Sequence, residues 1–545
     1  MRRRHHFTHR WPHVSSVTRR RAAPVPHQTS RGGFVLIVVT IVIVLLSLAA
    51  YNYSGTMQVE LEAAMMSGRD VEARMAAESG IEYAATRIMD YGYDDTINLY
   101  HDPASFNGYL IRDATSPRGR LRFSILVPDE ANLTGGGTRF GVTNENSKFN
   151  INRLLEIDEY DTEEVGYVYE AMAQIPGMTD DIADAILDWL DTDSDRRPGG
   201  AESGDYEALP IPYSAKNGPM DSIDELLKVQ GVTPLLFYGE DANRNGLLDP
   251  NEDDGDASSP LDNGDGILDL GWQTYLTATS RERNTDPDGV EKINLNQGQM
   301  TELFDALEPE LGEEAAAFIV AFRLGGTDYA QQLPGDTQNV EGLISRANID
   351  LTVVPQYTFT SIYDLIGGET NAVKMQSGTT QTFTSPWPED ANTILNEFPK
   401  LERILTVTDD AYIEGRININ QARVEVMRAV PGMPAAVPDA ILAARPAIDL
   451  TGASSNLLAR RNTAAWILAE NLVDLETLRL LGPYITTGGD VYRFQVVGHF
   501  DRGGPGVRLE AMIDATQAPP KVTFVRDLTS LGPGYHPSLL QSFQQ

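Results

Sequence analysis

The sequence predicts an α+β protein in which a long N-terminal helix packs on an antiparallel sheet and a large, mainly helical region is inserted between the strands of that sheet. Three observations predict it. A helical pattern runs through residues 34–90 without a proline. Longer strand-like runs lie at 120–149 and again after residue 484. The region between them repeats one supersecondary motif three times.

The composition is that of a folded protein and excludes several classes. Of 545 residues, 41% are hydrophobic and 22% are charged, which excludes collagen-like, wholly disordered and polytopic membrane chains. The formal net charge of −35 repels the phosphate backbone of nucleic acids. The absence of cysteine excludes disulfides, thiolate zinc sites and cysteine nucleophiles. At about 150 residues per domain, the length predicts three or four domains.

Residues 1–33 form a separate basic leader with eight arginines, five of the eight histidines and no acidic residue. The next segment, Phe34–Tyr51, is apolar apart from Thr40 and Ser47. As a helix it would be about 27 Å long, enough to cross the core of a bilayer. The basic flank is expected to stay cytoplasmic and the acidic body to be exported.

Beyond this apolar segment the helical pattern becomes amphipathic. Apolar residues such as Met57, Leu61, Val71, Met75 and Met89 recur at helical spacing among charged residues. One continuous helix over 34–90 would be about 85 Å long. Two interpretations are open at this point: a membrane anchor with a juxtamembrane stalk, or a helix that packs against copies of itself.

The start of this helix resembles a known family. The sequence Arg31-Gly32-Gly33-Phe34, between a basic leader and an apolar helix that turns amphipathic, resembles the class III signal of type IV pilins and type II secretion pseudopilins. The resemblance implies that a prepilin peptidase cuts between Gly33 and Phe34 and that the new Phe34 amine is methylated. It also implies a pilin-like fold for the helix and the sheet.

The fifth residue of the processed chain, counted from Phe34, narrows the resemblance to one family of pseudopilins. Most members of the family carry Glu there, whereas this chain has Val38. An uncharged residue is characteristic of the minor pseudopilin K family, whose members are expected at the pseudopilus tip. The physical reason agrees, because a subunit with no neighbour above it has no N-terminal amine to neutralise, and a lone carboxylate in the membrane is costly.

The strand-like runs are expected to form one antiparallel sheet on the N-terminal helix, with two separate sheets as the alternative. Arg120–Val127 alternates polar and apolar residues, Thr134–Thr138 is a glycine turn, and Arg139–Phe149 has an extended pattern. Further strands are predicted at Val491–Phe500, Val507–Ile513 and Lys521–Arg526. The predicted domains are the leader at 1–33, the membrane and pilin helix at 34–90, a pilin-like part at 91–149 completed by 484–545, and repeats at 150–290, 291–412 and 413–483.

The three repeats share a turn between two helical patterns. Pro176-Gly177 and Pro431-Gly432 each precede an Asp-Ala-Ile-Leu segment at the same offset, and a degenerate middle copy turns at Leu311-Gly312. Such a turn predicts tandem helix-hairpin-helix (SAM-like) units, which the pseudopilin K family also contains. In DNA-repair and DNA-uptake proteins this turn grips a phosphate. Acidic and neutral residues flank it here, which favours a packing turn over nucleic-acid binding.

The first acidic cluster runs from Asp188 through Asp191 and Asp193 to Glu202, with Tyr206 after it. It resembles the D-W-x-D-x-D…G-A-E…Y signature of the pseudopilin K family, which binds calcium in this region. The resemblance implies that Asp191, Asp193 and Glu202 are Ca²⁺ ligands, with Asp188 as a further candidate, since Ca²⁺ prefers carboxylate oxygens. The alternative is a solvated acidic loop.

The second acidic cluster fits the twelve-residue calcium loop of the EF-hand. The side chains at positions 1, 3, 5, 9 and 12 are those of Asp241, Asn243, Asn245, Asp249 and Glu252. Gly246 stands at position 6, and Leu247 supplies the carbonyl of position 7. Clean amphipathic helices do not flank the loop, so it is expected to be dockerin-like. A partial copy of this spacing follows, with Asn263, Asp265, Gly266 and Asp269 at matching positions but Leu261 at position 1.

Catalytic motifs are absent from the sequence, including metalloprotease, serine-hydrolase and nucleotide-binding patterns, so an enzyme is not expected. The resemblance implies a minor pseudopilin of a type II secretion system, acting in protein secretion across the outer membrane. It would be a single-pass protein of the inner membrane with a cytoplasmic N-terminus and a periplasmic body. The expected partners are other minor and major pseudopilins, the prepilin peptidase and, as a further candidate, secreted cargo. The alternative is a minor type IV pilin or a DNA-uptake component that binds nucleic acid through its helix-hairpin-helix turns.

Overall fold

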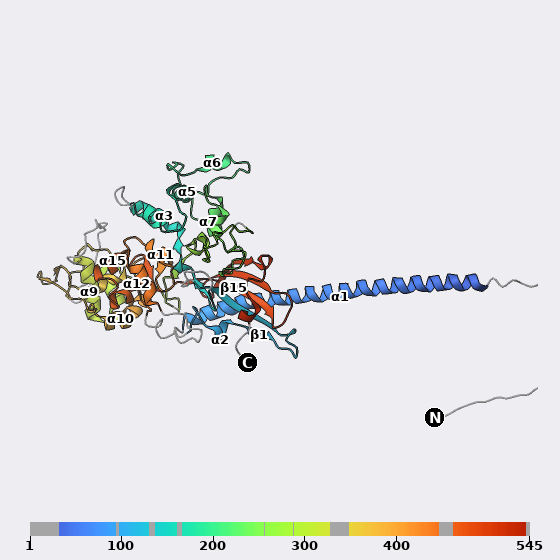
Figure 1. The fold of residues 1–545 in the computed structure, drawn as a ribbon. Helices are drawn as coiled ribbons and strands as arrows, with labels where there is room; N and C mark the ends of the chain where they lie inside the picture. Colours follow the sequence, from blue (N-terminus) through green and yellow to red (C-terminus); the bar gives the residue numbers. More distant parts are fainter. Residues whose placement is uncertain are drawn as a thin grey trace, which may run out of the picture. The chain divides into compact units, whose positions relative to one another are not determined.

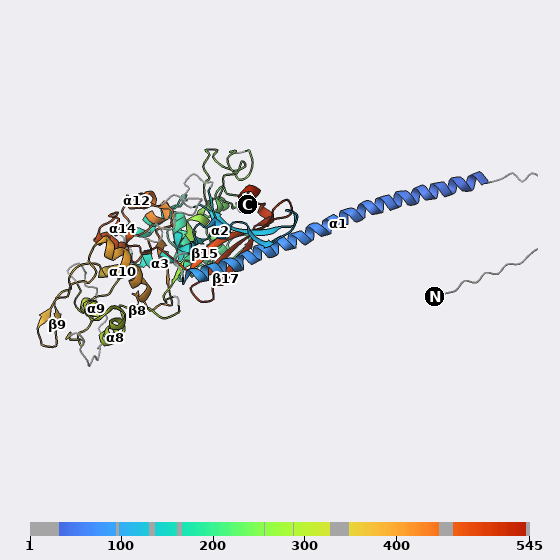
Figure 2. The ribbon, with the colours of Figure 1, turned by 90° about the horizontal axis from the view of Figure 1, so that it is seen from below.

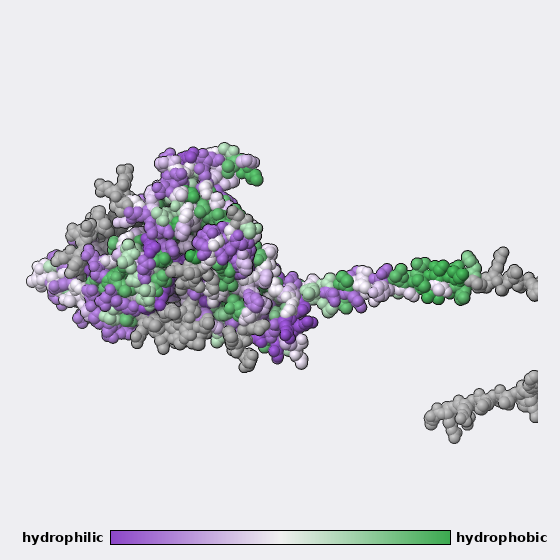
Figure 3. All heavy atoms as spheres, viewed as in Figure 1, coloured by the Kyte–Doolittle hydropathy of each residue, from purple (hydrophilic) through white to green (hydrophobic). Residues whose placement is uncertain are grey.

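The computed structural model describes residues 32–93, 97–129, 137–160, 166–255, 257–286, 288–326, 348–445 and 461–540. The chain divides into two compact units, residues 1–67 and 68–545. The described part of the first unit is the beginning of helix α1 (Gly32–Tyr91), so the predicted continuous helix is confirmed. Its side chains from Phe34 to Ser67 are all exposed, and an 18-residue window reaches a mean hydropathy of 3.0. Length and composition therefore allow this segment to cross a membrane, and Figure 3 shows the hydrophobic surface at the start of α1.

The strands predicted at opposite ends of the chain lie in one antiparallel sheet (Figures 1 and 2). Its order is β1 (Tyr109–Arg112), β2 (Leu121–Pro128), β15 (Val491–Phe500), β16 (Val507–Asp514) and β17 (Lys521–Asp527). The pairing of Leu121 with Phe500 joins the two distant segments at the centre of the sheet. The single sheet is therefore confirmed, and the alternative of two separate sheets is wrong.

The extended run predicted over Arg139–Phe149 is only partly formed. Short strands β3 (Thr138–Arg139) and β4 (Thr143–Asn144) pair with β2 and β15. A 3-10 turn, η1 (Glu145–Ser147), then interrupts the strand because the Asn144 side chain accepts a hydrogen bond from Asn146 N. The predicted glycine turn at Thr134–Thr138 lies mostly outside the described residues.

Within the second unit, α1 packs on the sheet through small residues. The buried face consists of Ala73, Ala76, Ala77, Gly80, Ile81, Ala84 and Ile88. Val71, Met75 and Met89, which were predicted on the apolar stripe, are exposed instead. The reason is the close approach of the sheet: a Cβ on Gly498 would collide with the Ala73 carbonyl, and one on Gly80 would collide with Val496.

Each of the three repeats is closed by a two-residue parallel strand pair. The pairs are β5 (Phe149–Asn150) with β6 (Leu276–Thr277), β8 (Ile293–Asn294) with β11 (Leu405–Thr406), and β13 (Ile417–Asn418) with β14 (Ile485–Thr486). Because parallel strands need a crossover connection, the helices of each repeat lie between its two strands in the sequence. The repeats share a hydrophobic core that is distinct from the one between α1 and the sheet.

Inside each repeat, two helices meet at a glycine with positive φ. The helix pairs are α4 (Tyr167–Met172) with α5 (Asp180–Leu190), α8 (Met300–Leu311) with α9 (Glu313–Gly325), and α11 (Val424–Arg428) with α12 (Val437–Ala444). The φ angle is 74° at Gly177, 86° at Gly312 and 74° at Gly432. Glycine adopts this conformation without the steric penalty that a Cβ brings.

The remaining described elements lie within the repeats or beside the sheet. The helices are α2 (Pro103–Phe106), α3 (Leu154–Tyr160), α6 (Ser203–Glu207), α7 (Pro234–Tyr238), α10 (Ala391–Ile404), α14 (Trp466–Ala469), α15 (Leu475–Leu481) and α16 (Pro537–Leu540). The 3-10 turns are η2 (Ile151–Arg153), η3 (Ile223–Lys228), η4 (Trp272–Thr274), η5 (Ile362–Leu365) and η6 (Thr529–Leu531). Two further antiparallel pairs are β7 (Arg281–Arg283) with β12 (Tyr412–Glu414), and β9 (Val373–Lys374) with β10 (Thr380–Gln381).

An asparagine side chain holds the same place in every repeat. The Asn152 amide donates to the Met220 and Ala278 carbonyls at 3.0 and 3.1 Å. The Asn296 amide donates to the Phe359 and Val407 carbonyls, at 2.9 Å each. In the third repeat the Asn420 amide donates to the Arg461 carbonyl. These bonds tie the start of each repeat to segments that come much later in the sequence.

We predict that Asn296→Ala lowers the stability of the body by about 2 kcal/mol, because two carbonyls lose their donor and the Phe359 amide loses its acceptor. The measurement is the thermal unfolding midpoint of the full chain in detergent. Asn396→Ala is the control, since that exposed side chain bonds only within α10. Equal midpoints for the two variants would contradict the prediction.

Candidate functional site

The first acidic cluster lies where α5 ends and α6 begins. Asp191 is the residue after the last turn of α5, and Glu202 caps the N-terminus of α6 by accepting from Ser203 N. Asp191, Asp193 and Glu202 each bring a carboxylate oxygen to within 4.8 Å of the other two. The structure thus brings together the three residues favoured as ligands.

The chemistry of this cluster fits a hard cation. Within the described part of the chain, Asp191 Oδ1 and Glu202 Oε1 are buried and have no hydrogen-bond partner. Burial raises the pKa of both carboxyls, and the neighbouring charges of Asp193 and Asp188 raise it further. A divalent cation would satisfy the unpaired oxygens and offset the repulsion between them.

Asp188 lies beside the cluster but is turned toward an arginine. Its fully buried carboxylate accepts from Arg197 N and, at 2.9 Å, from Arg197 Nη1. The same guanidinium contacts Asp191 Oδ2 at 2.5 Å and Asp158 Oδ2 at 3.1 Å. Arg197 therefore fixes the loop behind the ligand oxygens. Sequence reasoning missed this residue, although it is a cation inside the acidic segment.

The other residues of the signature are structural. Gly200 lies so close to the Asp188 carboxylate that a Cβ would collide with it. The rings of Trp189 and Tyr206 meet edge to face with centroids 5.3 Å apart, both in the core. The Tyr206 hydroxyl accepts from Gln230 N. The aromatic pair thus joins α5 to α6 and sets the distance between the acidic residues on each side.

The second acidic loop closes on itself through its own side chains. The Asp241 carboxylate accepts from the amides of Asn245 and Gly246, and Glu252 accepts from those of Ala242 and Asp249. The Asn243 and Asn245 side-chain amides donate to Asp249 Oδ2. The partial copy repeats one such contact, with Asn263 Nδ2 3.2 Å from Asp269 Oδ2.

Two acids of this loop, Asp241 and Glu252, are buried, which makes their negative charge costly. Glu252 is 1% exposed, and burial together with the charges of Asp241 and Asp249 raises its pKa to about 7. Burial also raises the pKa of Asp241. Asn243 Oδ1 is buried without a hydrogen-bond partner among the described residues. These features fit a cation at the centre of the loop.

The loop is docked on the sheet. Gln495 of β15 donates to the Arg244 carbonyl at 2.6 Å, and Arg508 of β16 donates to the Asn243 carbonyl. Asn245 Nδ2 donates to the Gly534 carbonyl at 2.5 Å. The Leu247 side chain packs against the core between α1 and the sheet. The spacing of the loop is visible in the sequence, whereas these contacts with the far end of the chain appear only in the folded structure.

The predicted processing residues lie at the beginning of α1. Gly33 is in the first turn, and the Phe34 side chain is exposed, as is Val38 four residues later. Arg31 and the leader before it lie outside the described residues.

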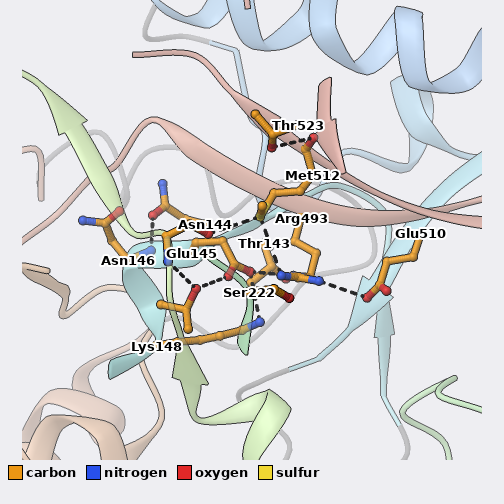
Figure 4. Close-up of polar contacts among 12 residues, drawn as sticks. Thr143, Asn144, Glu145, Asn146, Lys148, Ser222, Arg493, Glu510, Met512 and Thr523 are labelled. Carbon is orange, nitrogen blue, oxygen red and sulfur yellow. Dashed lines mark hydrogen bonds and ion pairs between the residues drawn. The ribbon is translucent and has the colours of Figure 1, made fainter. Parts of the chain in front are cut away.

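A buried carboxylate connects the first repeat to the sheet (Figure 4). Glu145 is 0% exposed; it contacts Arg493 Nε of β15 at 2.9 Å and Lys148 Nζ at 3.0 Å, and accepts from Thr277 Oγ1 of β6. Burial alone would raise its pKa, but Arg493 and Lys148 hold the pKa at about 2. In Figure 4, Arg493 lies between Glu145 and Glu510, which it meets at 3.5 Å.

Comparison with known proteins identifies relatives for part of the chain. The family model described as type II secretion system protein K matches residues 147–238, a segment that runs from η1 to the end of α7 and contains the first acidic cluster. Over this segment the chain is similar to type II secretion system protein K. The resemblance seen in the sequence is therefore confirmed. The second acidic loop begins just after the matched segment.

Two curated relatives carry the name type II secretion system protein K. The one from Aeromonas hydrophila is 27% identical over 226 residues, which cover 39% of this chain and 62% of the relative. The one from Pectobacterium carotovorum subsp. carotovorum is 25% identical over 181 residues, which cover 32% of this chain and 54% of the relative. The chain thus spans somewhat more than half the length of the curated relatives it matches.

A solved structure also resembles the chain. It is the GspK-GspI-GspJ complex of the type 2 secretion system from enterotoxigenic Escherichia coli. The match has a TM-score of 0.34 and 10% sequence identity, and it covers 84% of this chain and 98% of the solved chain.

We predict that Glu145→Gln destabilises the body by about 3–5 kcal/mol at pH 7, because Arg493 and Lys148 lose their buried counter-charge. The folded pKa of Glu145, about 2, is below its ordinary value of 4.5. The ionised carboxylate therefore stabilises the fold fully above pH 4.5 and progressively less as the pH falls toward 2.

The measurement is the free energy of unfolding from pH 7 to pH 2 for the full chain and for the variant. The variant is expected to lose less stability between pH 4.5 and 2. Glu156→Gln is the matched control, because Glu156 forms an exposed ion pair with Arg153, which contributes about 1 kcal/mol or less. Parallel pH profiles for Glu145→Gln and the unmodified chain would disprove the role of Glu145.

Proposed function

We propose that this chain is a minor pseudopilin of a type II secretion system and takes part in protein secretion across the outer membrane from the pseudopilus tip. The observation that carries the proposal is the match of residues 147–238 to protein K of that system, in a chain whose N-terminal helix is long and apolar enough to cross a membrane. The protein would act by assembly, and no catalytic step is involved.

In this proposal the start of α1 spans the inner membrane with its N-terminus in the cytoplasm, and residues 68–545 lie in the periplasm. Cleavage after Gly33 and methylation of Phe34 produce the mature chain. Val38 suits a tip subunit, because a glutamate at this position would have no neighbouring N-terminal amine to neutralise and would be costly within the membrane. Partners would include the prepilin peptidase, other minor and major pseudopilins, and secreted cargo. The solved relative is a complex of GspK with GspI and GspJ, which supports minor pseudopilins as partners.

We further propose that the three repeats are helix-hairpin-helix units whose turns serve packing. The turn at Gly177 lies against Leu236, and the equivalent turn at Gly432 lies against Leu480. The helix after the first turn begins with Asp180 and Asp181, which would repel a phosphate at that position. These contacts support packing over the alternative of a DNA-uptake component that binds nucleic acid. Salt-sensitive binding of duplex DNA by the full chain would favour the alternative.

We predict that Gly33→Val prevents processing, because the peptidase requires a small residue before the cleaved bond in this interpretation. The measurement is the mass of the chain purified from cells with and without the prepilin peptidase. The unmodified chain is expected to begin at methylated Phe34 only when the peptidase is present. Ser30→Ala, also in the leader, is the control and should be processed normally. A chain of unchanged mass in both hosts would refute the proposal.

The two acidic loops are proposed as Ca²⁺ sites that stiffen the inserted region. Asp191, Asp193 and Glu202 would hold one ion, with Asp188 positioning them through Arg197. Asp241, Asn243, Asn245, Asp249, Glu252 and the Leu247 carbonyl would hold the other. The support for the first site is the pair of buried oxygens without partners. The support for the second is the EF-hand spacing together with the burial of Asp241, Asn245 and Glu252.

We predict two calcium sites that can be removed one at a time, measured by calorimetric titration of the full chain in detergent. Glu202→Gln should weaken one site at least about tenfold and leave the other intact, whereas Asp241→Asn should do the reverse. Asp195→Asn is the control for the first loop, because its side chain is exposed and outside the cluster. Saturable binding that neither Glu202→Gln nor Asp241→Asn changes, or no binding at all, would contradict the assignment.

A further inference from the structure

A cavity of about 110 Å³ lies between the sheet and the first repeat, next to the ion-pair network of Figure 4. Its wall includes Arg493 and Gln495 of β15, Asp224 of η3, Arg244 of the second acidic loop and Arg423. One water molecule occupies about 30 Å³ in the liquid, so the cavity can hold a small ligand together with water. It is apart from the first acidic cluster, whereas Asp241 and Arg244 of the second acidic loop contribute to its wall.

Most of the charged groups around the cavity are already paired. Glu145 binds Arg493 and Lys148, and Asp224 binds Arg526. Glu510 lies 3.5 Å from Arg493 and 3.9 Å from Arg526. These three acids and three cations offset one another in charge. The Asp241 carboxylate accepts hydrogen bonds from the amides of its own loop.

Two guanidinium groups remain without a counter-charge. Arg423 precedes the first turn of α11 and is 6% exposed. Within the described residues its side chain has no hydrogen bond or ion pair, its Nε is fully buried, and its closest aromatic contact is the Tyr275 ring at 5.9 Å. Arg244 lies over the Tyr238 ring at 4.3 Å and forms no ion pair with any residue that the structure describes.

This arrangement is costly unless an anion is present. A buried charge without a partner loses its hydration and gains nothing in return. No ion pair joins Arg423 to Glu425, the acid two residues further along α11, in the described structure. The guanidinium presents a planar set of donors that matches a carboxylate or phosphate group. The protein has a net charge of −35, so two unpaired arginines on one cavity wall are a local exception to its excess of acidic residues.

We propose that this cavity binds a small-molecule oxyanion, a carboxylate or a phosphate, with Arg423 as its main ligand and Arg244 as the second. Neutral side chains on the wall, among them Gln273, Thr274 and Gln421, provide further polar contacts. Phe237, Leu270 and Phe494 form an apolar part of the wall, where the effective dielectric constant is low and the attraction between the opposite charges is strong. The site does not depend on the role proposed for the chain in secretion.

The test is calorimetric titration of the full chain in detergent, in a buffer free of chloride, phosphate and carboxylates. Inorganic phosphate and succinate are the two probes. One saturable site for either probe is expected, and the tighter probe identifies the anion class. Arg423→Gln should weaken binding at least about tenfold. Arg428→Gln is the matched control on the same helix, because Arg428 is exposed and pairs with Asp439; it should bind as the unmodified chain does.

Thermal unfolding distinguishes a role of Arg423 in binding the anion from a purely structural role of its side chain. Without added anion, Arg423→Gln should unfold at a temperature no lower than the unmodified chain, because the substitution removes an unpaired buried charge. The better probe should raise the midpoint of the unmodified chain but not that of the variant. If Arg423→Gln does not fold, Arg244→Gln takes its place in both measurements and should bind several-fold more weakly. Absence of saturable binding, or equal affinity in the variant, would overturn the proposal.

Discussion

The attachment of the inserted repeats to the sheet depends on one buried carboxylate. Glu145 lies just before the first repeat, and its oxygens bind Arg493 from the centre of the sheet and Thr277 from the strand that closes that repeat. Three segments far apart in the sequence therefore meet at one side chain. In a buried environment the loss of one partner leaves the others without compensation, so the geometry of this junction is strongly determined.

The repeats meet a second constraint. A long helical region is inserted into the chain without disturbing the five-strand path of the antiparallel sheet. Each repeat begins with one strand of a parallel pair and ends with the other strand of that pair, so its two ends lie side by side. The asparagines Asn152, Asn296 and Asn420 fasten each beginning to later segments. The inserted region has its own core, which allows the strands β2 and β15 to pair as direct neighbours despite their separation in the chain.

The two acidic loops differ in how far the spacing of their acidic residues in the sequence reveals the proposed metal site. In the first, carboxylates spaced along the chain converge because Arg197 and the Trp189–Tyr206 contact hold the two helix ends together. In the second, the spacing of the ligands lies within twelve consecutive residues, so the pattern is visible in the sequence itself. The docking of that loop on Arg508 and Gln495 also places Arg244 on the wall of the cavity that we assign to an anion.

The sequence by itself determined the features that depend on local spacing: the long helix, most of the strands, the glycine turns and the acidic residues of both loops. Hydrophobic period, turn chemistry and ligand spacing act over a few residues and can be recognised there. Only the tertiary structure decided which face of α1 is buried, because the approach of Gly498 to Ala73 selects small residues over Val71 and Met75. The same holds for the pairing of Glu145 and the isolation of Arg423, since a charge has a partner or lacks one according to which distant segments pack against it.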